Sequence, residues 1–145
     1  MGPADFFEDL MTTRIDEDEI LTQVSFPLAP ARSGYGFREL CIRHGDFAIV
    51  TAAVQLTLSE ENRFTDARVA VSGAGPKALR IHKAEQALVG QEGNGNVFQE
   101  AAACVPDAID PPADQKASKA YRREMAKVFV RRALDDAWSM TRVKE

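Results

Sequence analysis

Residues 50–58 read Val50-Thr51-Ala52-Ala53-Val54-Gln55-Leu56-Thr57-Leu58, and every second side chain from Val50 onward is apolar. Alternate side chains of a β-strand lie on one face, so this stretch predicts a strand with one buried face. Residues 35–42 and 64–72 are also predicted to be strands, separated from the central one by the polar segments 43–46 and 60–63. Three successive strands joined by short polar segments are typical of an antiparallel meander.

A further strand is expected nearer the N-terminus, at residues 18–27. Ile20, Val24 and Phe26 lie on one side of it, and Pro27, which lacks a backbone N–H, would end it. We expect Leu21 in this strand and Arg38 in the next to be neighbours in one sheet.

The second half of the chain has apolar residues at helical spacing. Helices are predicted over 77–89, followed by the C-cap glycine Gly90, and over 97–105, with Asn96 as the N-cap. Ser118 is predicted to cap a longer last helix, whose apolar face would hold Tyr121, Met125, Val128, Phe129, Arg132 and Trp138. Strands followed by helices predict an α+β sandwich, in which an antiparallel sheet of three or four strands carries about three helices on one face.

The composition is that of one globular domain: 145 residues, of which 45% are hydrophobic and 28% charged. No run approaches the roughly 18 apolar residues that a membrane span needs, and the N-terminus does not look like a signal peptide, so no membrane partner is expected. The two cysteines, Cys41 and Cys104, are too far apart for a metal knuckle or a CxxC motif. We expect buried thiols in the reducing cytoplasm.

Charge is unevenly distributed around a formal net charge of −4. Residues 1–30 carry seven acidic residues and one arginine, whereas residues 116–145 carry nine basic and four acidic ones. A basic terminus can indicate nucleic-acid binding. Here the charges alternate with apolar positions at helical spacing, so no nucleic-acid partner is expected. Arg122–Arg123 and Arg131–Arg132 are interpreted as a solvated helix face that can pair with Glu124, Asp135 and Asp136.

Few residues offer catalytic or metal chemistry. The two histidines, His44 and His82, have no companion His, Cys or carboxylate at a metal-binding spacing. His82 is expected on a helix surface, and His44, between two strands, is the better candidate for a ligand contact, although a structural role is favoured there too. The glycines of residues 72–76 do not complete G-x-G-x-x-G, so a structural turn is favoured over a phosphate site. No serine lies in a G-x-S-x-G elbow, which argues against a hydrolase.

The segment Arg43-His44-Gly45-Asp46-Phe47-Ala48 resembles the R-x-G-D-F-A signature of the medium subunit of carbon monoxide dehydrogenases. This flavoprotein family of the molybdenum hydroxylases includes the FAD domain of xanthine dehydrogenases. Other segments resemble the family in the same order, and together they cover nearly the whole chain. They are Asp5–Phe7 with Asp18–Leu21, the A-E-x-x-L-x-G helix at Ala84–Gly90, and the terminal helix from Asp114 to Leu134 with Tyr121-Arg122-Arg123. The family's usual paired arginine is replaced here by Arg43-His44.

The resemblance implies that residues 1–30 are the end of the FAD-binding domain with a connecting strand, and that residues 31–145 are the C-terminal α+β domain. In this family the medium subunit holds FAD and receives electrons from iron–sulfur clusters, which are reduced by a molybdenum site elsewhere in the complex. The implied partners are the N-terminal FAD-binding domain, the iron–sulfur small subunit and the molybdopterin large subunit. The family's glycine-rich pyrophosphate loops do not occur in this sequence, so we expect weak or no FAD binding by this chain alone.

Two cofactor-binding residues are implied by the resemblance. Leu21 matches the apolar residue whose backbone approaches the flavin, and Arg38 matches the cation near the isoalloxazine, usually a lysine in the family. No catalytic or metal residue is expected, and the chain would form one wall of a flavin site without being active alone. Ordinary strand packing for Leu21 and an exposed surface cation for Arg38 remain open readings. The alternative function is a non-catalytic interaction or oligomerisation module that kept the fold without binding flavin.

Overall fold

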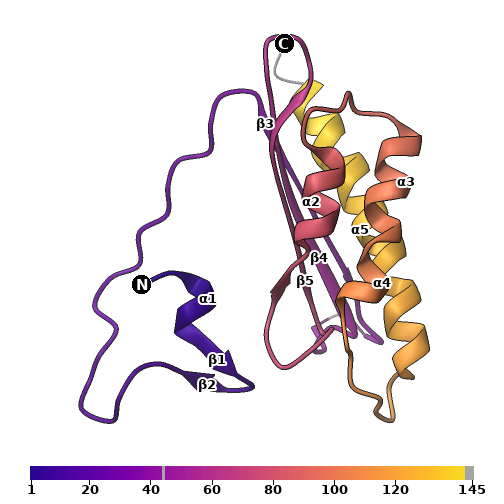
Figure 1. The fold of residues 1–145 in the computed structure, drawn as a ribbon. Helices are drawn as coiled ribbons and strands as arrows, with labels where there is room; N and C mark the ends of the chain where they lie inside the picture. The colour runs from indigo at the N-terminus through magenta and orange to yellow at the C-terminus, as the bar shows by residue number, and fades with distance from the viewer. Residues whose placement is uncertain (44, 143–145) are drawn as a thin grey trace.

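The computed structural model describes residues 1–43 and 45–142 and has two main layers, a sheet and a set of helices (Figure 1). The main sheet has four strands in the order β3-β4-β5-β6, so each strand pairs with the next along the chain. All three pairs are antiparallel. They are β3 (Ser33–Leu40), β4 (Val50–Leu58), β5 (Phe64–Ser72) and β6 (Leu79–Arg80). The expected meander is therefore confirmed.

The helices of the second half are α2 (His82–Leu88), α3 (Gly95–Ala103), α4 (Val105–Ala108) and α5 (Lys119–Arg142). All lie on the same side of the sheet, with α5 packed along β3 and β4 and α2 on β5 (Figure 1). Within residues 1–43 and 45–142, none of these four helices lies on the other face of the sheet (Figure 1). The α+β sandwich expected from the sequence is confirmed.

β4 lies in the middle of the core because its alternating apolar residues face the helices. Val50, Ala52, Val54, Leu56 and Leu58 are all buried, whereas the intervening Thr51, Ala53 and Gln55 are only partly buried. Burial of the apolar row against the helices removes it from water, which is the main force that holds the two layers together.

β3 approaches α5 unusually closely through two glycines. A Cβ atom on Gly36 would lie 2.0 Å from the carbonyl oxygen of Ala133, and one on Gly34 would lie 2.1 Å from that of Ala137. Two residues along a strand advance about 6.8 Å and four along a helix about 6 Å, so the two pairs repeat almost in step. Any side chain at either glycine would push the helix away from the strand.

The buried face of α5 differs in part from the predicted one. Phe129 is buried and Trp138 is partly buried, as expected, but Tyr121 and Arg132 are exposed. The rest of the buried face is formed mainly by small residues and by one arginine: Arg122, Ala126, Val130, Ala133, Leu134, Ala137 and Thr141. Close packing on β3 requires small side chains. A prediction of the buried face that relies on large apolar residues therefore misses the alanines.

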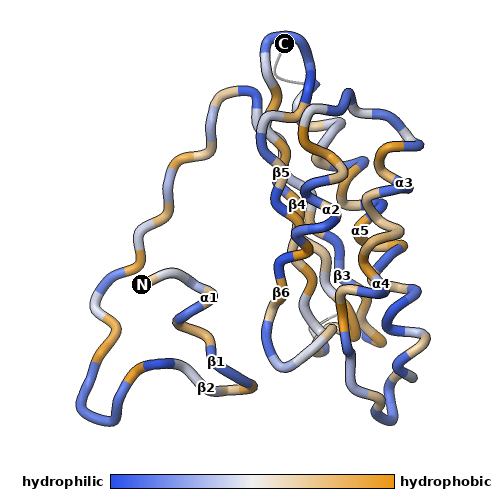
Figure 2. Tube along the Cα trace, viewed as in Figure 1, coloured by the Kyte–Doolittle hydropathy of each residue, from blue (hydrophilic) through white to orange (hydrophobic). Residues whose placement is uncertain are grey.

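The strand predicted at residues 18–27 is wrong. Residues 18–27 form no strand, and their apolar side chains are exposed. Earlier in the chain, residues 3–13 form α1 (Pro3–Phe6) and a small hairpin of β1 (Phe7–Asp9) and β2 (Thr12–Thr13). Residues 1–32, called the N-terminal segment below, run outside the main sheet and still carry hydrophobic stretches (Figure 2). Lys77 Nζ joins this segment to the rest of the chain by donating to the carbonyls of Ala4 and Phe7. A strand needs a neighbour for its backbone hydrogen bonds, and the described part of the chain supplies none here.

Two predicted helices begin at other residues than expected. The helix predicted from residue 77 begins at His82, because Leu79 and Arg80 pair with β5 instead. α3 begins at Gly95, since the side chain of Asn94, not Asn96, accepts hydrogen bonds from the first turn.

The other caps are confirmed. Gly90 follows α2 with a φ of +81°, and Ser118 Oγ accepts a hydrogen bond from the backbone N–H of Tyr121 at 3.2 Å. Among the described residues, no helix combines the length and the apolar character that crossing a membrane would require.

Candidate functional site

Arg38 lies on β3, on the side of the strand that faces α5. It follows Gly34 and Gly36 on that face and pairs across the sheet with the buried Ala52. Its guanidinium donates from Nε to Asp136 Oδ2 at 2.5 Å and from Nη2 to Asp136 Oδ1 at 2.8 Å. The side chains of Arg38 and Asp136 are 51% and 36% exposed, so this ion pair lies at the border between sheet and helix, open to solvent.

The arrangement leaves Arg38 both charged and accessible. Hydrogen bonds to Asp136 and the attraction of its charge raise the pKa of Arg38 above its already high usual value. Asp136 engages the Nε side of the guanidinium, and the Nη1 donors make no hydrogen bond to the described residues. Arg38 can therefore offer a second acceptor its remaining edge without giving up the ion pair.

Leu21 lies elsewhere, in the N-terminal segment. Its side chain is 52% exposed, and the residue belongs to no strand. The expectation that Leu21 and Arg38 are neighbours in one sheet is therefore wrong, because the stretch that carries Leu21 does not join the sheet (Figure 1). The described residues do not bring the two candidate residues together.

The loop between β3 and β4 contains the signature segment of residues 43–48. The N–H of Asp46 donates to the carbonyl of Arg43 at 3.1 Å, and the N–H of Ile49 donates to the carbonyl of Leu40 at 2.7 Å. Phe47, in the same loop, is 91% exposed. His44 lies outside the described residues. The bond between Ile49 and Leu40 closes the loop at the end of β3 and just before β4, and the bond between Asp46 and Arg43 lies within the loop.

The glycine turn after β5 is built for packing against β4. Gly73 has a φ of +74°, and a Cβ atom there would lie 2.4 Å from the carbonyl oxygen of Ile49. β6, not a helix, follows the turn, so no helix N-terminus points at it. Both features support the structural turn that the sequence favoured over a phosphate site.

Arg122 corrects the interpretation of the basic residues as a solvated face. Its side chain is 5% exposed and donates to the carbonyl of Ile49 at 2.5 Å and to Asp114 at 2.7 Å. It also donates to the carbonyl of Gly73 at 3.4 Å. Arg122 thus joins α5 to the ends of β4 and β5, where a lysine could not make the same set of bonds. The resemblance marked Asp114 and Arg122 as motif residues, which was the available signal.

Arg131 and Arg123 are closer to the expected solvated face that pairs with nearby acids. Arg131 pairs with Asp135 one turn along α5, a pairing that the sequence analysis expected. Arg123 donates to the carbonyl of Ile109 at 3.1 Å and pairs with Asp110. None of these groups converges on a common anion-binding point.

Glu85 is the buried acid of the A-E-x-x-L-x-G helix. Its carboxylate accepts from the N–H of Val69 at 2.9 Å and from Arg80 Nε at 2.5 Å, and it lies 2.9 Å from His82 Nδ1. Burial by itself raises the pKa of Glu85, but the hydrogen bonds from Arg80, Val69 and His82 together lower it. Glu85 therefore stays ionised and ties α2 to β5 and to the end of β6.

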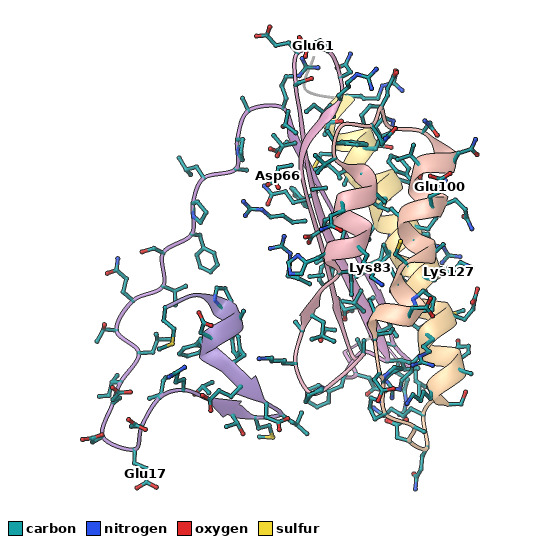
Figure 3. All side chains as sticks on the ribbon, in the orientation of Figure 1. Glu17, Glu61, Asp66, Lys83, Glu100 and Lys127 are labelled. Atoms are coloured by element: carbon teal, nitrogen blue, oxygen red, sulfur yellow. The ribbon has the colours of Figure 1, made fainter. Side chains whose placement is uncertain are left out.

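An open groove of about 450 Å³ lies beside Glu85, lined by Asp66, Ala67, Arg80, His82, Glu85, Gln86 and Val89. Figure 3 shows Asp66 pointing to the side of the sheet that the helices leave uncovered. His82 is exposed, as expected for a helix surface. Over the described residues, no three His, Cys, Asp or Glu side chains gather at a metal-binding geometry.

Comparisons with known proteins match this fold and these motifs. The glyceraldehyde dehydrogenase medium chain of Sulfolobus acidocaldarius is 30% identical over 134 residues, 91% of this chain and 46% of that protein. The 6-hydroxypseudooxynicotine dehydrogenase complex subunit alpha of Paenarthrobacter nicotinovorans is 34% identical over 82% of this chain and 40% of its own length. This chain thus spans about half the length of the curated relatives it matches.

Solved structures agree with the sequence comparison. Carbon monoxide dehydrogenase from Hydrogenophaga pseudoflava superposes with a TM-score of 0.89 and 28% identity, over 94% of this chain and 47% of that chain. Quinoline 2-oxidoreductase from Pseudomonas putida 86 superposes with a TM-score of 0.85 and 28% identity, over 93% of this chain and 46% of that chain. Residues 35–137 match the model of the CO dehydrogenase flavoprotein C-terminal domain, and the chain belongs to that family.

Proposed function

We propose that this chain is the C-terminal portion of the flavoprotein subunit of a molybdenum-hydroxylase-type oxidoreductase, in which it forms one wall of the FAD site. The site serves electron transfer from iron–sulfur clusters to the flavin. The observation that carries the proposal is the family match over residues 35–137, which includes most of β3 with its exposed cation Arg38. The relatives' names support it, since they are medium chains and subunits of dehydrogenases.

The residues present fit one end of FAD. Arg38 offers an accessible cationic donor edge, and Leu21 offers exposed apolar surface in the N-terminal segment. For the pyrophosphate, the described residues offer no comparable cradle, because the glycines at Gly34, Gly36 and Gly73 are all filled by neighbouring backbone. We assign Arg38 and Leu21 to the isoalloxazine end, as the resemblance implies, although the described structure does not bring the two residues together. We assign the pyrophosphate to another part of the subunit.

The chemistry follows from this division. When bound, FAD supplies the electron-accepting ring. Arg38 would hold a positive charge near the bound ring, where that charge would stabilise a negatively charged reduced flavin. The side chain stays protonated throughout and neither gives nor takes a proton.

The partners we propose are the N-terminal FAD-binding domain, the iron–sulfur small subunit and the molybdopterin large subunit. Residues 1–30 would be the end of the FAD-binding domain with its connecting segment, and residues 31–145 the C-terminal domain. Exposed Ile20, Val24 and Phe26 in the first of these regions supply apolar surface for contact with the rest of the FAD-binding domain. We further propose a cytoplasmic location, since Cys41 and Cys104 are both free thiols.

The proposal is tested by titration with FAD. The chain alone should bind FAD weakly or not at all, and binding should appear when the N-terminal FAD-binding domain is added. Flavin fluorescence quenching and equilibrium dialysis measure both cases. Stoichiometric tight binding by the chain alone would contradict the division of the site, and no binding in the presence of the added domain would contradict the function.

A second candidate function is the interaction module that binds no flavin. Tyr35 and Phe37 favour it, because both are large and exposed on the uncovered face of β3. In that case light scattering would give a stable oligomer without flavin absorbance and without any need for the FAD-binding domain. A monomer that takes up FAD only with its partner would exclude it.

A further inference from the structure

The ion pair between Arg38 and Asp136 joins two residues that are 98 positions apart in the chain. It brings an acid from the last helix to the candidate flavin cation on the first strand of the sheet. Both oxygens of the carboxylate are used, one on Nε and one on Nη2. A side-on pair of this kind fixes the plane of the guanidinium as well as its position.

Stability does not account for the pair. β3 and α5 are already held together by the close approach of Gly34 and Gly36 to the helix backbone. An ion pair as exposed as this one adds little to the free energy of unfolding. Its main consequence is therefore local, in the direction and the effective charge of the Arg38 side chain.

The direction of the Arg38 side chain follows from which of its guanidinium donors are bonded to Asp136. With Nε and Nη2 held by Asp136, the Nη1 edge is the one left for a ligand. A lysine on the same strand position has one flexible ammonium group and could not be oriented in this way. The arginine therefore depends on a partner for its orientation, and Asp136 is that partner.

The effective charge follows from Coulomb's law. A guanidinium paired with a carboxylate has a weaker field at a distance than an isolated cation, because the two charges partly cancel. A neighbouring ring that becomes negatively charged on reduction is then stabilised less than it would be by an unpaired arginine.

We propose that Asp136 is a positioning residue of the flavin site, which holds the Nη1 edge of Arg38 toward the ring and keeps the reduction potential of the flavin below the value that an unpaired Arg38 would give. This inference rests on the proposed function. Asp136 itself touches no cofactor in this account and acts through Arg38.

The test uses the flavoprotein assembled from this chain and its FAD-binding domain. Asp136→Asn keeps the shape of the side chain and removes its charge, and Asp135→Asn, which disturbs the neighbouring pair with Arg131, is the matched control. The measurement is the flavin midpoint potential, obtained by reductive titration against a reference dye. We expect D136N to raise the ratio of reduced to oxidised flavin about tenfold at a fixed ambient potential, which is about 30 mV for a two-electron couple.

A third variant separates action through Arg38 from a direct effect. Arg38→Gln should lower the potential, and D136N added to it should produce less than half of the shift seen alone. The inference is overturned if D136N shifts the potential no more than D135N does, or if its full shift persists in the R38Q background.

A different set of results would contradict the proposed function itself. In that case the assembled wild-type protein takes up no FAD, or R38Q changes neither the affinity for FAD nor the potential. Circular dichroism during thermal unfolding shows whether each variant is folded, and D136N should unfold like the wild type because its ion pair is exposed.

Discussion

The N-terminal segment and the sheet-and-helix body use apolar residues in opposite ways. In the body, leucines such as Leu56, Leu88 and Leu134 are fully buried between the layers. In the N-terminal segment, Leu10, Leu28 and Ile20 are largely exposed. Both regions carry hydrophobic stretches, but only those of the body lie between the sheet and the helices (Figures 1 and 2). Burial of apolar side chains therefore stabilises mainly the body, and the exposed apolar side chains of the segment offer surface for contacts with other protein surfaces.

The largest expected change in the free energy of unfolding comes from truncating a buried leucine of the body, with an exposed leucine of the N-terminal segment as the comparison. Leu88 is 0% exposed on α2, and Leu28 is 94% exposed. Leu88→Ala should lower the free energy of unfolding by about 3 kcal/mol, because it removes buried methyl groups and leaves a cavity. Leu28→Ala should change it by less than about 0.5 kcal/mol. Urea denaturation followed by circular dichroism measures both, and an equal loss for the two variants would refute the comparison.

A smaller effect is expected from the pH dependence of one buried acid. The folded state lowers the pKa of Glu85, so its stabilising contribution is complete above the usual glutamate pKa of 4.5 and is lost as the pH falls below that value. Glu85→Gln should remove this acid-side dependence and cost about 1 kcal/mol at pH 7, since the charged hydrogen bonds to Arg80 and His82 are weakened.

Glu17 supplies the control from the other region. It lies in the N-terminal segment, where Figure 3 shows its side chain pointing away from the rest of the chain. Urea denaturation at pH 7 and at pH 3.5 should give Glu17→Gln the same loss of stability on acidification as the wild type. If Glu85→Gln loses as much as the wild type does, Glu85 is not the group responsible.

Most of the body could be predicted from the sequence because its signals are local. Alternation predicts β4, polar residues predict the turns, and Ser118 and Gly90 mark helix ends by their own chemistry. Residues 18–27 alternate in the same way and still form no strand, since alternation describes one strand and says nothing about a partner for it. The start of α2 was displaced for the opposite reason, because β5 provided a partner for Leu79 and Arg80.

The site was predictable only as far as the resemblance reached. It pointed to Arg38 and to the motif residues Glu85 and Arg122, but not to what they contact. The contacts of Arg38 with Asp136 and of Arg122 with Asp114, Ile49 and Gly73 depend on how α5 lies across the sheet, which no local pattern records. The sequence predicts Arg122 as part of a solvated helix face because the basic residues alternate with apolar positions at helical spacing. Its backbone partners Ile49 and Gly73 lie far away in sequence, although Asp114 is only eight positions from it.

The smallest effect on stability is expected at Leu21, which lies in the N-terminal segment and is also a proposed residue of the flavin site. Leu21→Ala should leave the unfolding of the isolated chain unchanged within about 0.5 kcal/mol, because the side chain is half-exposed and outside the sheet. In the assembled flavoprotein it should weaken FAD binding by only about threefold, or roughly 0.7 kcal/mol, since the resemblance assigns the contact mainly to the backbone. Leu21→Pro, which changes that backbone, should weaken binding more, and Ile20→Ala serves as the neighbouring control. If Leu21→Ala destabilises the isolated chain, the side chain of Leu21 packs on the body. If Leu21→Pro leaves FAD binding unchanged, Leu21 does not belong to the site.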